Sequence, residues 1–204
     1  MEEYLAPGAF VESDHPKVVA FAAAATAGAH GERERLAALF TAVRDGIRYD
    51  PFAFSDDREH YRASAVVDAP ASYCVPKSIL LCAGARALGV PARLAFADVR
   101  NHLQSERLRT LMGIDLFVYH GYVELHVDGH WRKASPAFNR ELCARFGVDA
   151  IDFDGSADAV LHPFDGDGAR YMEYVRERGS YADFPFDEVV GGILGAYPGF
   201  AVDG

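Results

Sequence analysis

The residues best suited to nucleophilic chemistry in this sequence are its three cysteines, Cys74, Cys82 and Cys143. Cys74 comes directly before an apolar pattern with helical spacing that begins at Val75, whereas Cys82 lies inside that pattern. The N-terminus of a helix carries about half a unit of positive charge, which lowers the pKa of a nearby thiol and favours the reactive thiolate. The sequence therefore indicates Cys74 as a candidate nucleophile, and Cys82 and Cys143 as residues that pack in the core.

His120 is the histidine that we expect to act with Cys74. It lies within an aromatic and β-branched run, so a cysteine at the start of a helix is followed along the chain by a histidine on a strand. An imidazole beside a thiol can form an ion pair with the thiolate and can later protonate a leaving amine. A lone histidine on a strand is more often structural, so this expectation depends on the pairing with Cys74.

A helix and a strand must bring these two residues together. Residues 75–88 predict a largely buried helix, and Gly89 followed by Pro91 is a typical helix end. Residues 94–99 alternate in the manner of a strand that leads out of this helix. Cys74 is thereby expected at the N-terminus of a buried helix that is followed directly by a sheet.

The clearest strand pattern in the chain carries His120. Residues 117–127 are rich in aromatic and β-branched side chains, and Asp128-Gly129 suits a two-residue type I′ turn. Residues 130–135 then return as the partner strand. The pattern predicts an antiparallel hairpin with His120 in its first strand.

The remaining segments complete an α+β fold. Helical patterns, loops and a polar crossover follow in this order: helices at 18–27 and from 32 to about 46, a loop at 50–70, the crossover at 101–112, a short helix at 139–146, and helices at 169–178 and 186–194. The length suits one domain over residues 1–204, with an N-terminal helical lobe packed on an antiparallel sheet. Residues 149–204 form a C-terminal extension that could cover the Cys74 site.

Two motifs give the sequence a resemblance to the transglutaminase-like superfamily of papain-like cysteine enzymes. The segment "YCVPKSILLCAGARALGVPAR" is similar to the family's cysteine, apolar helix and "lGiPAR" exit, and "HGYVELHVDGHW" is similar to its "HxWxEV…GxW" hairpin. The resemblance covers about residues 18–139. It implies a papain-like core in which Cys74 is the nucleophile and His120 its partner.

The third residue of the family's triad is different here. The family has an aspartate four residues after the hairpin tryptophan, and this chain has Ser135 at that position. A serine hydroxyl can accept the imidazole N–H and fix its tautomer, but it has no charge to stabilise the imidazolium. Asn139 could instead supply an amide oxygen, as in papain-type enzymes. Either residue, or neither, could orient His120.

The resemblance implies acyl transfer at amide bonds through a thioester on Cys74. The second nucleophile decides between peptide hydrolysis, deamidation and cross-linking, and we expect a peptide or protein amide as substrate. An alternative is a catalytically weakened or inactive binding or scaffold module, which the serine at position 135 favours. Acetyl transfer from a CoA thioester is a third option, but no basic cluster is present to hold the phosphates.

The acidic composition argues against several other classes of function. A formal charge of −10 opposes binding to nucleic acid or to an anionic membrane surface. No apolar stretch has the length of a membrane span, and the first residues lack the positive charge of a signal peptide, so we expect a cytoplasmic protein. The sequence makes no prediction of the oligomeric state.

Neither a cofactor nor a metal ion is predicted. The hairpin residues His120, Glu124, His126 and His130 could suggest zinc, but His130 is on the other strand, and residues six apart on one strand are roughly 20 Å apart. We expect Glu124 to face a basic group and His126 to face solvent. The "DFDG" and "DGDG" segments lack the ligand spacing of a calcium loop and are read as turns.

Overall fold

The computed structural model describes residues 1–102, 105–161, 172–197 and 199. Its elements in chain order are η1 (Glu2–Tyr4), α1 (Pro16–Ala25), α2 (Gly31–Gly46), β1 (Arg48–Tyr49), η2 (Arg58–Tyr61), α3 (Ala63–Val66), β2 (Ala71–Ser72), α4 (Cys74–Ala87), β3 (Ala92–Asn101), α5 (Glu106–Met112), β4 (Leu116–Val127), β5 (His130–Ala134), α6 (Arg140–Arg145), β6 (Met172–Tyr181) and α7 (Phe186–Ala196). The predicted α+β fold, with a helical lobe on an antiparallel sheet, is confirmed.

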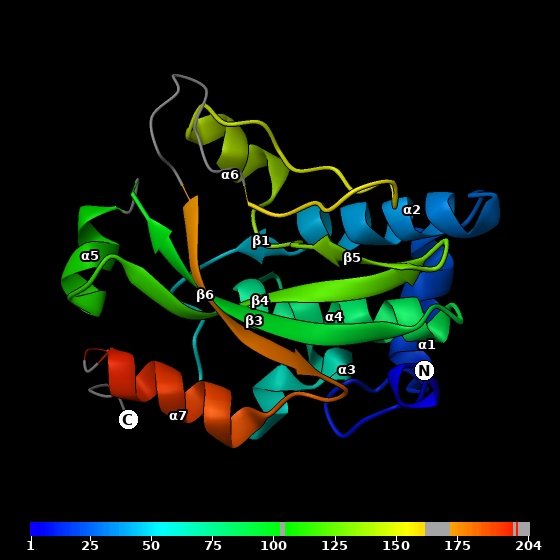
Figure 1. Ribbon diagram of the computed structural model, residues 1–204, viewed down its shortest axis with the longest axis horizontal. Coiled ribbons are helices and arrows are strands. Elements are labelled where there is room, and N and C mark those ends of the chain that lie inside the picture. The colour runs from blue at the N-terminus through cyan, green and yellow to red at the C-terminus, as the bar shows by residue number, and fades with distance from the viewer. Residues whose placement is uncertain (103–104, 162–171, 198, 200–204) are drawn as a thin grey trace.

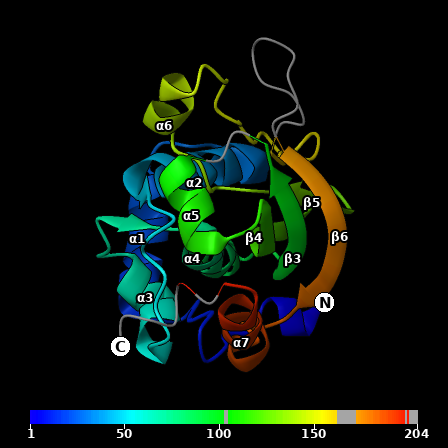
Figure 2. The same cartoon turned by 90° about the vertical axis from the view of Figure 1, so that its left-hand side faces the viewer.

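The sheet has four antiparallel strands in the order β5-β4-β3-β6. Helix α4 packs against β3 and β4 on one side and against α1, α2 and α3 on the other, so it is the central element of the core. Figure 2 shows these helices on one side of the curved sheet, with α4 nearest to it. All residues of α4 from Cys74 to Arg86 are buried, as the apolar pattern predicts.

The hairpin that carries His120 forms as predicted. Strands β4 and β5 pair from Val123 opposite Ala134 to Val127 opposite His130, and Asp128 and Gly129 both have positive φ, as a type I′ turn requires. Because β5 is short, the part of β4 that holds His120 extends beyond the end of its partner. This segment therefore lies at a free edge of the sheet, close to the start of α4.

The predicted helix at 169–178 is wrong. Residues from Met172 onward form β6, which pairs antiparallel with β3 from Asn101 opposite Met172 to Leu94 opposite Tyr181; residues 169–171 lie outside the described part of the chain. The segment is rich in Met, Glu and Arg, which favour helices locally, but the edge of β3 offers it backbone pairing along most of its length, with two register shifts. The sheet therefore contains one more strand than the sequence predicts.

Part of the predicted polar crossover at 101–112 is helical. Helix α5 begins after Ser105, whose Oγ accepts a hydrogen bond from Leu108 N–H, and ends at Gly113 with a φ of 72°. Helices α5 and α7 lie at the same end of the molecule, on the left in Figure 1. Both helices contribute to the site described below.

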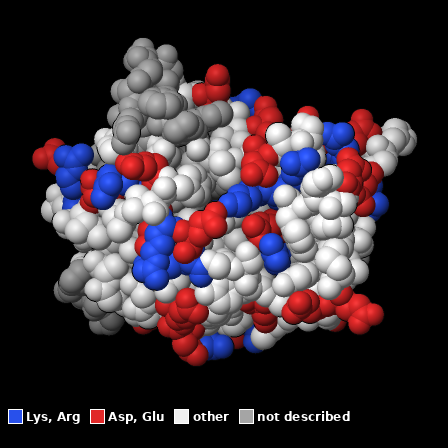
Figure 3. Space-filling view, viewed as in Figure 1, with Lys and Arg blue, Asp and Glu red and all other residues white. Residues whose placement is uncertain are grey.

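The face of the sheet that points away from the helical lobe carries alternating charges. Figure 3 shows Lys, Arg, Asp and Glu side chains mixed across this face. Arg93 pairs with Glu124 at 2.5 Å and Lys133 pairs with Glu177 at 2.5 Å. The expectation that Glu124 faces a basic group is thereby confirmed.

Candidate active site

Cys74 is the first residue of α4 and is buried. The preceding residue, Tyr73, has an extended backbone (φ −107°, ψ −174°), so the chain turns sharply into the helix at the cysteine. The backbone N–H groups of Cys74 and Val75 act to lower the pKa of the thiol. The first turn of the helix therefore favours the thiolate, as expected for a residue at a helix N-terminus.

The free edge of β4 lies directly against this thiol. The backbone N–H of Gly121 acts on the Cys74 thiol and favours its ionised form. A Cβ at position 121 would lie 3.0 Å from Val75 Cα and 3.4 Å from the carbonyl oxygen of Cys74, so a larger residue would push the strand away from the helix. Gly121 thus permits the close approach that brings the neighbouring His120 to the site.

Cys74 and His120 line one pocket, whose volume is about 450 Å³ when the solvent space at its mouth is included. The other lining residues come from the loop after β1, from β4, and from the helices α5 and α7. They are Tyr49, Pro51, Phe54, Tyr73, Leu108, Met112, Phe117, Val118, Tyr119, Ile193 and Tyr197. The structure therefore brings the predicted nucleophile and the predicted base to the same cavity.

Ser135 lies beside the imidazole of His120. Its Oγ is 3.2 Å from Nε2, and both residues are buried. Backbone hydrogen bonding fixes Ser135, since its N–H donates to the carbonyl oxygen of Ala159 at 2.8 Å. With Nε2 at the serine, Nδ1 is the other ring nitrogen that can accept a proton.

Asn139 occupies a different place. Its Oδ1 accepts a hydrogen bond from the backbone N–H of Tyr49 at 3.0 Å, and the residue caps the start of α6. Tyr49 forms part of the pocket wall, so Asn139 positions that wall. Of the two candidates that could orient His120, the structure places Ser135 at the imidazole.

Burial keeps both members of the pair neutral at rest. Removal from water raises the pKa of the Cys74 thiol to about 11, although the N–H groups of Gly121 and Val75 act in the opposite direction. Burial also lowers the pKa of His120 to about 4. The expected lowering of the thiol pKa by the helix N-terminus is therefore wrong in sign, because desolvation outweighs the helix.

A buried lysine lies one helical turn after Cys74. Lys77 Nζ donates hydrogen bonds to the carbonyl oxygens of Arg44 at 2.8 Å and Ile47 at 2.6 Å, at the end of α2. Burial lowers its pKa to about 7. When charged, this ammonium lowers the pKa of Cys74, so it favours the thiolate.

Tyr119, next to His120, has an unusual backbone and is held by a network of charged groups. Its φ is 54°, and its N–H donates to Asp98 Oδ1 at 3.2 Å, at the point where the pairing of β3 and β4 shifts register. Arg178 binds Asp98 through two nitrogens at 2.9 and 2.8 Å, and its guanidinium lies over the Tyr119 ring at 4.3 Å. Positive φ in a bulky residue is strained, so these contacts stabilise the backbone that presents His120.

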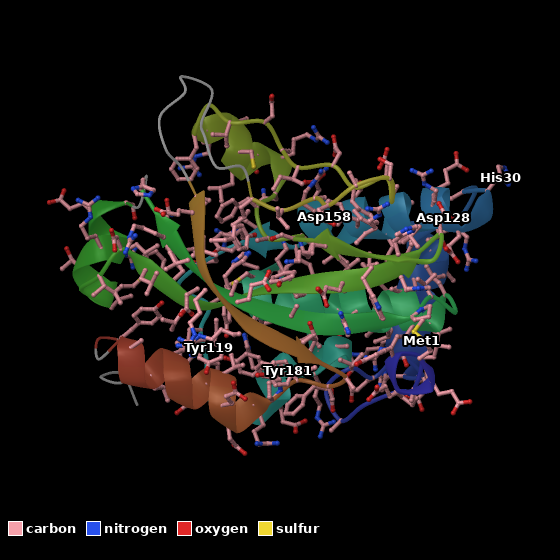
Figure 4. All side chains as sticks on the ribbon, viewed as in Figure 1. Met1, His30, Tyr119, Asp128, Asp158 and Tyr181 are labelled. Atoms are coloured by element: carbon pink, nitrogen blue, oxygen red, sulfur yellow. The ribbon has the colours of Figure 1, made fainter. Side chains whose placement is uncertain are left out.

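Helix α7 contacts the same network. The hydroxyls of Tyr119 and Tyr181, both labelled in Figure 4 above α7, donate to Glu188 at 3.3 and 2.9 Å. A Cβ at Gly192 would lie 2.3 Å from the Tyr119 ring, so the glycine lets the helix pack closely on the tyrosine. This packing places Ile193 and Tyr197 in the pocket wall.

Several of these positions carried signals that the sequence analysis did not use. A glycine within the strongest strand pattern, Gly121, is typical of close backbone approach. A lysine within an apolar helix, Lys77, indicates a buried charge with a specific partner. The roles of Tyr119 and Asp98 depend on a register shift between two strands, which has no local signature.

The described residues contain no group of three His, Cys, Asp or Glu side chains arranged to hold a metal ion. His126 packs edge-on against Trp131, and His130 Nδ1 lies 2.9 Å from the carbonyl oxygen of Asp128.

Cys82 and Cys143 are buried, as expected of core residues. Within the described part of the chain, no helix has the length and apolar character required to cross a membrane.

A comparison with one solved structure agrees with this architecture. A "putative cysteine protease" from Cytophaga hutchinsonii superposes with a TM-score of 0.50 at 16% identity, over 87% of this chain and 53% of that one. This chain therefore spans about half the length of that protein, and the likeness shows the fold alone. A "putative protease" from Parabacteroides distasonis gives a TM-score of 0.42 at 17% identity, over 58% of this chain and 23% of that one.

The sequence comparisons are consistent with the two motifs. A search of curated protein sequences gave no match. The sequence model described as "Transglutaminase-like superfamily" matches residues 19–136, which is more than half of the chain and includes Cys74, His120 and Ser135. The chain belongs to the transglutaminase-like superfamily.

Proposed function

We propose that the protein catalyses acyl transfer at amide bonds, with Cys74 as nucleophile and His120 as general base and acid. The observation that carries the proposal is the shared pocket, which is lined both by the Cys74 thiol and by a buried imidazole whose Nε2 lies beside Ser135. Family membership supports the same chemistry. The natural substrate in this proposal is a peptide or protein amide.

The resting pair is a neutral thiol and a neutral imidazole. As the sulfur attacks the carbonyl carbon, the thiol proton passes to His120 and the S–C bond forms. We assign to the N–H of Cys74, at the start of α4, the stabilisation of the resulting oxyanion. The imidazolium then protonates the leaving nitrogen, the C–N bond breaks, and a thioester and a free amine result.

The second half of the cycle regenerates the thiol. His120 removes a proton from water or from an amine, the new nucleophile attacks the thioester, and the sulfur leaves with the proton from the imidazolium. Water gives an acid, and thus hydrolysis or deamidation, while an amine gives a new amide. We favour hydrolysis, and both outcomes share the thioester.

Product analysis with a library of N-acylated peptide amides tests the proposal. Mass spectrometry should detect the acid product, and an added primary amine should divert part of the acyl group to a new amide. Cys74→Ser and His120→Ala should each lower the rate by a factor of 10³ or more, and Cys82→Ala, in the same helix, should not. A rate that survives both substitutions would contradict the proposal.

A second candidate function is a binding module without catalysis. Ser135 in the place of the family's aspartate favours it, because a neutral hydroxyl does not stabilise the imidazolium. In that case the pocket would bind an amide without cleaving it. Binding of the library peptides with unchanged affinity in His120→Ala, and no turnover in the wild type, would favour this candidate.

A further inference from the structure

We propose that the transferred acyl group carries an uncharged apolar side chain. The inference rests on the proposed function and names the substrate class of that site. The side chain would bind in what we call the acyl pocket, the part of the cavity beyond the reacting residues. Its walls are Phe54, Leu108, Met112, Val118, Ile193 and Tyr197.

The walls of the acyl pocket are apolar on every side that the structure describes. A loop, strand β4 and the helices α5 and α7 each contribute at least one residue, and no Asp, Glu, Lys or Arg of the described residues lines the cavity. Counted together with the solvent space at its mouth, the cavity has a volume of about 450 Å³, and an acyl side chain that enters it next to Cys74 would contact these apolar walls. Four separate parts of the chain thus form one apolar receptor.

The tyrosine hydroxyls around the cavity are engaged with protein groups. Tyr197 OH donates to the carbonyl oxygen of Leu116 at 2.8 Å and accepts from the backbone N–H of Val118 at 2.5 Å. Tyr73 OH lies 2.7 Å from Tyr61 OH. A carboxylate or ammonium in the pocket would lose its water without gaining a charged partner, so charged acyl groups are disfavoured.

Charged groups behind the pocket are also paired. Asp98 and Arg178 form a bidentate ion pair, and Glu188 accepts hydrogen bonds from Tyr119 and Tyr181. The Tyr119 ring lies between this network and Gly192 of α7. These charges therefore hold the wall in place and do not offer a counterion to the substrate.

Alkylation of Cys74 by three chloromethyl ketones tests the inference, because the acyl portion of each probe occupies the position of the substrate acyl group. The probes are chloroacetone, 1-chloro-4-phenylbutan-2-one and its 4-carboxyphenyl analogue. Second-order rate constants are measured by intact mass spectrometry and divided by the rate constant of each probe with glutathione. This division removes the intrinsic reactivity of the probes.

We expect the phenyl probe to react at least tenfold faster than its carboxylated analogue after normalisation, and faster than chloroacetone. Ile193→Lys, which adds an ammonium to the wall, should lower this ratio at least tenfold. Gly195→Lys adds the same charge on the exposed side of α7, with nothing within 4 Å of a Cβ there, and should leave the ratio unchanged. Ile193→Phe serves as a second wall variant without a buried charge, and should slow the phenyl probe but not chloroacetone.

Equal or faster labelling by the carboxylated probe would overturn the inference, and so would failure of the phenyl probe to label Cys74. These outcomes differ from a failure of the proposed function. The ratio between probes depends on the pocket, whereas His120→Ala should slow all three probes by the same factor. A phenyl preference without any thioester intermediate would contradict the proposed catalysis and leave the acyl pocket in place.

Discussion

The contact between Ser135 Oγ and His120 Nε2 makes the substitution Ser135→Asp the most informative perturbation of this site. The change restores the carboxylate that the family has at this position, 3.2 Å from the imidazole in the present geometry. A carboxylate this close stabilises the imidazolium. The substitution should therefore change the plot of the Cys74 alkylation rate against pH in two ways. It should move the pH at which the rate falls on the acid side, and it should change the rate on the plateau.

The magnitude follows from the resting state of the pair. A thiol pKa of about 11 and an imidazole pKa of about 4 lie seven pH units apart, which is roughly 10 kcal/mol in favour of the neutral pair. For two unit charges about 4 Å apart, attraction between a thiolate and an imidazolium offsets about 4 kcal/mol of this at an effective dielectric constant of about 20. The neutral pair thus predominates, and the ion pair is a minor form that reacts.

A carboxylate beside Nε2 should raise the pKa of His120 by about 1 to 3 units. The acid limb of the alkylation profile, expected near pH 4 in the wild type, should move up by the same amount. Because the same interaction stabilises the ion pair, the rate on the plateau should rise by about 10- to 1000-fold. The two changes have one cause and must occur together.

The assay measures the rate of iodoacetamide addition to Cys74 between pH 3 and pH 10. Ser135→Asn is the matched control, since it has the size of aspartate without the charge and should leave the acid limb in place. Urea unfolding of both variants measures the effect of adding atoms at a buried position. An acid limb that does not move in a folded Ser135→Asp protein would refute the reasoning, as would a shift without a faster plateau.

Three further predictions concern the surroundings of the site. Gly121→Ala should lower the free energy of unfolding by about 1–3 kcal/mol, because the new Cβ would lie 3.0 Å from Val75 Cα in α4. Gly191→Ala, on the open face of α7, is the control and should raise the free energy of unfolding by about 0.5–1 kcal/mol. Equal effects of the two substitutions in urea titrations would contradict the close approach of β4 to α4. Asp98→Ala removes the acceptor of the Tyr119 N–H and should lower kcat roughly tenfold with little change in KM, and an unchanged kcat would show that this network does not position the base. The pKa of His120 is about 4 in the folded protein and about 6.5 in the unfolded chain. Between these two values the unfolded state binds more protons, so the free energy of unfolding should fall by about 3 kcal/mol as the pH drops from 6.5 to 4. Parallel stability curves for the wild type and His120→Gln over this range would contradict the burial of a neutral imidazole.

The hairpin and helix α4 could be predicted from the sequence because their patterns are local. The apolar run after Cys74 has the spacing and length of a buried helix. The Asp128-Gly129 turn fixes the register of the two strands that flank it. These two elements bring Cys74 and His120 to one pocket, and Ser135 follows from the second strand of the same hairpin. This part of the candidate site therefore depends on short-range information.

Strand β6 and the pKa of Cys74 could not be predicted, because both depend on distant parts of the chain. Met, Glu and Arg in residues 172–178 favour a helix locally, and only pairing with the edge of β3 makes the segment a strand. The helix N-terminus favours a thiolate, but strand β4 and helices α5 and α7 exclude water from the thiol and reverse the sign of the shift. A local sequence pattern does not show how deeply the folded protein buries the Cys74 thiol.

The central claim is that Cys74 forms a covalent acyl intermediate with the help of His120. Its most direct measurement is the intact mass of the protein after rapid acid quench during turnover of an activated phenylpropanoyl ester, followed by peptide mapping. We predict one acyl group per chain, on Cys74, labile to hydroxylamine as a thioester, and formed at least 100-fold more slowly in His120→Ala. An acyl group on another residue, or equal rates in the two proteins, would contradict the account.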